Sequence, residues 1–151
     1  MTAYFFDSSA LAKQYHQEAG SAKVTAIFQE PERRIIVSQL TVVEIRSMLA
    51  GKVRSGTLTP TEARGVVDHF KADIASGSIE VFALSEFNFR QAEGLIAQYG
   101  FEQRLRSLDA LQLALALDLR DQRITATMVA ADKVLVEVAA REGLVVIDPS
   151  A

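Results

Sequence analysis

The chain contains no cysteine, which excludes both a disulfide framework and a thiolate metal site. It also lacks a charged segment followed by an apolar core after Met1, the pattern of a secretory signal peptide. Its longest apolar-rich stretch, residues 108–117, is interrupted by Asp109 and Gln112 and is far shorter than the roughly 20 residues that span a bilayer. We therefore expect a soluble, cytoplasmic protein with no membrane segment.

Several catalytic motifs are absent as well. There is no G-x-S-x-G elbow for an activated serine, no G-x-G-x-x-G loop and no P-loop, which removes the simplest serine-hydrolase and nucleotide-cofactor interpretations. His16 and His69 have no second histidine at ligand spacing, so we expect both to be ordinary surface or edge residues.

The composition indicates one globular domain, residues 1–151, because 49% of the residues are hydrophobic and suffice for one buried core. With a net charge of −3 the chain lacks the overall basic balance typical of proteins that hold nucleic acid mainly by charge, but this does not exclude a nucleic-acid substrate. Eleven of the 16 basic residues are arginine, however, and a local arginine cluster can still contact phosphates.

Short β-branched and aromatic runs predict strands at residues 3–6, 34–37, 79–84, 124–129 and 144–147. Helical spacing of apolar residues predicts helices at 9–17, 21–29, 41–50, 60–75, 86–99, 108–121 and 132–141. The helix at 60–75 has the clearest start, a capping box of Thr59 and Glu62 around Pro60. This alternation predicts the α/β class, with a parallel sheet between layers of helices.

The leucines at odd positions from 111 to 119 alternate with period two, which by itself indicates a strand. The intervening alanines and the length of the segment favour a helix that is apolar nearly all round. We predict a helix that is buried within the domain or at a subunit interface.

Four acids stand where an apolar run gives way to a predicted helix start: Asp7, Glu44, Asp109 and Asp132. The carboxyl ends of parallel strands meet at one edge of the sheet, so distant segments can gather these side chains in one crevice. Clustered carboxylates repel one another unless a cation neutralises them, and a hard divalent ion prefers oxygen ligands. The set predicts a metal pocket suited to phosphodiester hydrolysis with Mg²⁺ or Mn²⁺.

Each acid alone also has a structural explanation. Asp7 and Asp132 can cap the helices that follow them, and Glu44 can complete a capping box with Thr41. Asp109 can lie in the first turn of its helix, where the dipole favours negative charge. Capping and metal binding are compatible, so only the ordered set argues for a metal.

The segments around these acids, residues 4–11, 37–44, 108–114 and 129–132, resemble the four acidic motifs of the PIN domain family, and more specifically of the VapC toxins of toxin–antitoxin pairs. The resemblance implies a three-layer α/β/α sandwich with a mostly parallel sheet. It also implies a Mg²⁺-dependent endoribonuclease, for which Mn²⁺ can substitute. The expected partners are an RNA substrate, an inhibitory antitoxin and a second copy of the chain.

By this resemblance the four acids are the catalytic metal ligands, and Ser9 is a supporting hydroxyl. Ala130 departs from the family, which often has Thr or Ser two residues before the fourth acid, so Asp132 is the ligand most in question. Arg46, Arg104 and Arg106 are candidates for contacting RNA phosphates, although an arginine on a helix face is often simply solvated.

Two other functions are compatible with the sequence. One is a catalytically weak PIN-like interaction module that binds a partner protein or RNA. The other is a phosphatase of the haloacid dehalogenase type, whose motif needs a second Asp where this chain has Ser9.

Overall fold

The computed structural model describes residues 1–151 as five strands and seven helices. The strands are β1 (Ala3–Phe6), β2 (Arg34–Ser38), β3 (Glu80–Phe82), β4 (Thr127–Val129) and β5 (Val145–Ile147). The helices are α1 (Ser8–Tyr15), α2 (Ser21–Phe28), α3 (Gln39–Arg54), α4 (Pro60–Ala75), α5 (Glu86–Tyr99), α6 (Ser107–Asp121) and α7 (Lys133–Arg141).

All five strands run parallel in one sheet with the order β3-β2-β1-β4-β5. In the register, Tyr4 of β1 lies opposite Ile35 of β2, and Phe5 lies opposite Met128 of β4. The central strand β1 thus has β2 on one side and β4, far away in sequence, on the other. This is a switch point in strand order, where open α/β sheets form a crevice beyond the carboxyl ends of the strands.

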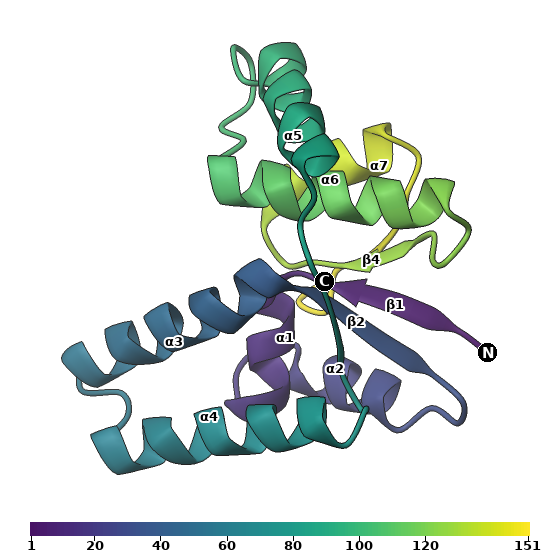
Figure 1. The fold of residues 1–151 in the computed structure, drawn as a ribbon. Coiled ribbons are helices and arrows are strands. Elements are labelled where there is room, and N and C mark those ends of the chain that lie inside the picture. The colour runs from purple at the N-terminus through teal and green to yellow at the C-terminus, as the bar shows by residue number, and fades with distance from the viewer.

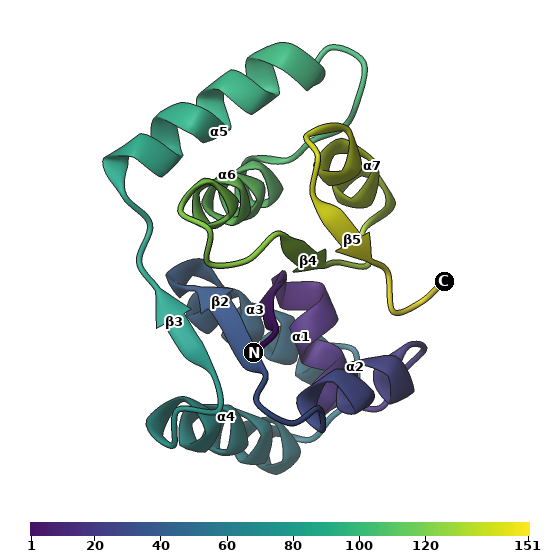
Figure 2. The ribbon, with the colours of Figure 1, turned by 90° about the vertical axis from the view of Figure 1, so that its right-hand side faces the viewer.

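Helices cover both faces of the sheet, as Figures 1 and 2 show. The first four helices, α1 to α4, lie on one side, and α5, α6 and α7 lie on the other. The expected three-layer α/β/α sandwich is therefore confirmed.

The alternation of side chains along β1 divides the core between the two faces. Tyr4 and Phe6 pack into a cluster with α1 to α4, whereas Phe5 packs into a second cluster with α5 to α7. Phe5 and Phe6 are both fully buried. The strand that leads into Asp7 is thereby packed on both faces.

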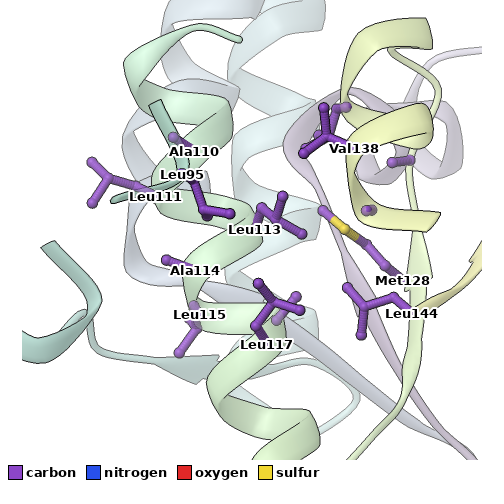
Figure 3. Close-up of a cluster of buried hydrophobic side chains, with 14 of the residues drawn as sticks. Leu95, Ala110, Leu111, Leu113, Ala114, Leu115, Leu117, Met128, Val138 and Leu144 are labelled. Atoms are coloured by element: carbon purple, nitrogen blue, oxygen red, sulfur yellow. The ribbon is translucent and has the colours of Figure 1, made fainter. Parts of the chain in front are cut away.

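Helix α6 is the centre of the second cluster, and the predicted helix there is confirmed. Figure 3 shows Leu113 of α6 pointing toward Met128 of β4 and Val138 of α7, and Leu95 of α5 lying against the same helix. Because α5, α7 and the sheet surround it, α6 is apolar on nearly all sides.

Element boundaries account for most differences from the sequence predictions. β4 begins at Thr127 rather than at residue 124, because the Thr125 hydroxyl donates to the Ala3 carbonyl (2.6 Å) and accepts from the Thr127 N–H (3.1 Å). Helix α3 begins at Gln39 and continues through Gly51 to Arg54, so it is longer than the predicted 41–50. The capping box at the start of α4 is confirmed. None of the helices is long and apolar enough to cross a membrane.

Candidate active site

The four acids lie near the N-terminal ends of four different helices. Asp7 caps α1, Glu44 lies in the second turn of α3, Asp109 lies in the first turn of α6, and Asp132 caps α7. All four line one cavity of about 310 Å³. Its lining residues are Asp7, Ser8, Ser9, Glu44, Met48, Arg106, Asp109, Gln112, Ala131 and Asp132. The fold thus gathers side chains that are up to 125 residues apart in the chain.

Asp7 sits directly beyond the central strand. Its backbone N–H donates to the Val129 carbonyl of β4 (3.0 Å), which extends the β1–β4 pairing to the cavity. Its side chain accepts from the Ala10 N–H (2.9 Å) and from the Ser9 hydroxyl (3.0 and 3.1 Å). The same carboxylate therefore caps a helix, lines the cavity and accepts from the Ser9 hydroxyl.

Burial dominates the chemistry of Asp7, which is only 4% exposed. Loss of solvation raises the pKa of Asp7 to about 7. The hydrogen bonds from Ala10 and Ser9 oppose this rise, and the negative charges of Asp109 and Glu44 add to it. A cation in the cavity would relieve both the desolvation and the repulsion.

Glu44 belongs to a hydrogen-bonded network, not to a capping box. Its Oε1 accepts from the Ser8 hydroxyl (2.8 Å) and from Nε2 of Gln112 (2.9 Å). The predicted capping box with Thr41 is wrong, because α3 starts at Gln39 and its N-cap residue, Ser38, makes no side-chain cap. Glu44 is therefore too deep in the helix to serve its first turn.

Three residues of this network were not among the predicted site residues: Ser8, Thr41 and Gln112. The Gln112 Nε2 lies 3.1 Å from both hydroxyl oxygens, which are 2.9 Å from each other. One sequence signal was available, since Gln112 follows Asp109 by one helical turn and is the only polar residue in the leucine-rich and alanine-rich segment 110–117.

Asp109 and Asp132 share one cationic neighbour. Arg106 places its Nε 3.6 Å from Oδ2 of Asp109 and its Nη2 3.8 Å from Oδ2 of Asp132. Burial, followed by repulsion from Asp132, raises the pKa of Asp109, and Arg106 opposes the rise. Asp132 also accepts from the Leu135 N–H (2.9 Å), which confirms its predicted capping role.

The donor set of the cavity is made of oxygen atoms, as a hard divalent cation requires. No three or more of the chain's acids and histidines stand in an arrangement that could already hold an ion. The residues present therefore fit a hard divalent metal in their chemistry.

A comparison with protein families matches residues 4–144 to the model described as the PIN domain. The chain belongs to the PIN domain family. The match includes all four acids and every strand except β5, so the family expected from the four motifs is confirmed.

Solved structures share this PIN fold at low sequence identity. VapC20 of Mycobacterium tuberculosis, described as a sarcin–ricin loop cleaving toxin, has a TM-score of 0.68 at 18% identity, with 97% of this chain and 99% of that chain covered. VapBC2 of Rickettsia felis, bound to a promoter DNA fragment, gives 0.65 at 12% identity, with 97% and 98% covered. FitAcB of Neisseria gonorrhoeae gives 0.62 at 16% identity, with 97% of each covered. A comparison with curated protein sequences gives no match.

The three predicted arginines lie in different places in this PIN domain. Arg106 lines the acidic cavity, whereas exposed Arg104 does not. Arg46 lines a separate cavity of about 410 Å³ between α3 and α4, together with Arg64 and Asp68. Only Arg106 is therefore next to the four acids.

Ala130 lies in the core. It is fully buried in the cluster around α6, and its N–H donates to the Ile147 carbonyl of β5 (3.1 Å). The cavity is lined instead by Ala131, its neighbour. The position that carries a hydroxyl in many family members thus contributes packing in this chain.

Proposed function

We propose that this PIN domain is a metal-dependent endoribonuclease that acts as the toxin of a toxin–antitoxin pair. The observation that carries the proposal is the convergence of Asp7, Glu44, Asp109 and Asp132 on one cavity at the switch point of the sheet. Membership of the PIN family and the fold shared with VapC20 support it.

In this proposal the four carboxylates hold Mg²⁺, for which Mn²⁺ can substitute. A bound ion would supply Lewis-acid chemistry that activates water and neutralises phosphate charge. Ser9 and the Ala10 N–H hold the Asp7 carboxylate in place through their hydrogen bonds. The side chain of Asp132 is 35% exposed and that of Asp109 is 19% exposed, so Asp132 is the more solvated of the two.

Arg106 has a further role in the proposal. Its guanidinium lies beyond hydrogen-bonding distance of both Asp109 and Asp132, and its side chain is 66% exposed. A divalent cation that neutralised the two carboxylates would weaken their hold on Arg106. The guanidinium would then be free to bind a phosphate of the RNA.

The proposed partners follow from the neighbours in fold. The structure from Klebsiella pneumoniae is described as a toxin–antitoxin complex. We therefore include a cognate antitoxin and a homodimer in the proposal.

The decisive experiment is RNA cleavage by the purified, antitoxin-free protein with Mg²⁺ or Mn²⁺. Asp7→Asn keeps an N-cap and removes a charged ligand, so we expect cleavage to fall by at least about a hundredfold. Asp121→Asn, which changes an exposed acid at the end of α6, is the matched control and should cleave as the wild type does. Undiminished cleavage by Asp7→Asn would falsify the assignment of the cavity.

The second candidate function is a PIN-like interaction module that no longer turns over a substrate. The open arrangement of the carboxylates and the apolar surroundings of Ala130 favour it. Calorimetric titration with Mn²⁺ separates the two functions, because an interaction module has no need of the ion. Absence of binding at millimolar Mn²⁺ would support the module and exclude the nuclease.

A further inference from the structure

We infer that Gln112 is a positioning residue that orients Glu44 for metal binding, an inference that rests on the proposed nuclease function. Gln112 lies on α6 and is 1% exposed. Its side-chain amide reaches across the cavity floor to α1 and α3. Gln112 is not one of the four proposed metal ligands. It acts on the ion only through its hydrogen bond to Glu44.

The first argument is the cost of burying this amide. Its Oε1 is buried and accepts no hydrogen bond, which is unfavourable for the folded state. Its chain neighbours Leu111 and Leu113 are buried in the apolar core, whereas Gln112 lines the acidic cavity. A polar residue in such a place needs a compensating role, and all of its bonds run through Nε2.

The second argument comes from counting hydrogens around Glu44. The Ser8 hydroxyl has one hydrogen, which points to Oε1 of Glu44 (2.8 Å). The Thr41 hydroxyl must then be the donor in its 2.9 Å contact with Ser8. Of the two Gln112 N–H groups, one donates to the same Oε1 (2.9 Å), and the other is shared by the two hydroxyl oxygens.

This count leaves the two oxygens of Glu44 in different states. Oε1 accepts two hydrogen bonds, whereas Oε2 accepts none from the protein. The carboxylate cannot rotate without breaking both bonds. Oε2 of Glu44 is therefore available to bind an ion, and Oε1 fixes the orientation of the carboxylate through its two hydrogen bonds.

The third argument is the position of the network among the acids. Ser8 follows Asp7 in the chain, Thr41 precedes Glu44 by one turn, and Gln112 follows Asp109 by one turn. The bonds of Gln112 thus tie together the three segments that carry the first three acids. A change in the amide alters the spacing of the ligands as well as the rotamer of Glu44.

The test compares Mn²⁺ affinity, followed by calorimetry and by the electron paramagnetic resonance signal of the free ion, in the wild type and Gln112→Met. Methionine has the same length and no hydrogen-bond donor. Loss of a residue that orients a ligand typically weakens metal binding by about 10–100-fold, and we expect a loss in this range.

Asn88→Ala is the matched control. Asn88 is another amide that is 1% exposed, but it donates to Asp118 near the C-terminal end of α6 (3.0 Å) and lines no part of the acidic cavity. We expect it to lower the melting temperature without changing Mn²⁺ affinity. A purely structural role of Gln112 would give the same result in Gln112→Met.

The outcomes are distinguishable. Gln112→Met that folds and binds Mn²⁺ as the wild type does overturns the inference and leaves the proposed nuclease standing. If that variant does not fold, Ser8→Ala decides, because it removes the second donor to Oε1 with little change in volume, and unchanged affinity there overturns the inference. A wild-type protein that binds no Mn²⁺ overturns both the nuclease and the role of Gln112.

Discussion

Asp7 serves the fold and the site with the same side chain. Its carboxylate caps α1 by accepting from the Ala10 N–H, and it lines the acidic cavity. The two roles conflict in one respect, because a carboxylate that is 4% exposed is poorly solvated. Residues that serve function at the expense of stability are typical of active sites.

This conflict predicts how stability depends on pH. The pKa of Asp7 is near 4 in the unfolded state, and burial raises it to about 7 in the folded state. At a pH between these two values, the folded state therefore holds a proton that the unfolded state lacks. Stability from this group is therefore present at low pH and is lost as the pH rises through this window. We expect Asp7→Asn to raise the melting temperature at pH 8, by at least about 4 °C.

The measurement is thermal unfolding at pH 5 and pH 8 in metal-free buffer. The advantage of Asp7→Asn over the wild type should shrink as the pH falls toward 5. The exposed-acid variant Asp121→Asn should show no such change. An advantage that is equal at both pH values would contradict the role of Asp7 ionisation.

Single residues also show where sequence reasoning reaches its limit. The caps at Asp7 and Asp132 are local, so the short-range pattern was sufficient to predict them. The bonds of Gln112 join segments up to 104 residues apart, and no local pattern specifies them.

Among the secondary-structure elements, the bounds of the long helices were easier to predict than the bounds of the strands. The repeated apolar spacing of α4 and α5 is long and regular, and their bounds were predicted exactly as found at both ends. β3 ends at Phe82 although its apolar pattern continues, because the Leu84 N–H donates to the side chain of Gln39 (2.8 Å). A side chain from a distant helix thus replaces the next bond of the sheet.

The burial of α6 predicts a strong dependence of stability on its packing. Leu113 of α6 is fully buried, and its side chain points toward β4 and α7 (Figure 3). We expect Leu113→Ala to lower the free energy of unfolding by about 2–5 kcal/mol, because it leaves a cavity in the core. Urea denaturation measures this change.

Leu108 provides the control for this prediction, because it lies on the same helix and is 46% exposed. Leu108→Ala should change the free energy of unfolding by less than about 1 kcal/mol. If the two variants lost similar amounts of unfolding free energy, core packing would not be the main way in which α6 stabilises the protein.

For the whole molecule, the parallel sheet could be predicted, but the order of its strands could not. Alternating strands and helices are typical of a parallel sheet, and short connections restrict its handedness. The insertion of β1 between β2 and β4 depends on which apolar faces pack together across the chain. This order is what brings Asp132 beside Asp7.

The dimer expected from the sequence relied on leucine-rich and alanine-rich helices as an interface. The structure uses α6 inside the protein, so the apolar surface for association must lie elsewhere. Phe87 and Phe89 on α5 are 49% and 55% exposed, and both are large enough to contribute to an interface. We expect a homodimer by light scattering at micromolar concentration, shifted toward monomer by Phe89→Asp. A wild-type monomer would contradict the expectation.

The place of β4 in the sheet has a consequence for the order in which the protein is synthesised. β1 leaves the ribosome first, but its second neighbour, β4, begins only at Thr127 of the 151 residues. Until then the nascent chain has Asp7, Glu44 and Asp109 without Asp132 and without the strand that completes their edge of the sheet. A ribosome that stalls or a message that is truncated before this point therefore releases a polypeptide with an incomplete site.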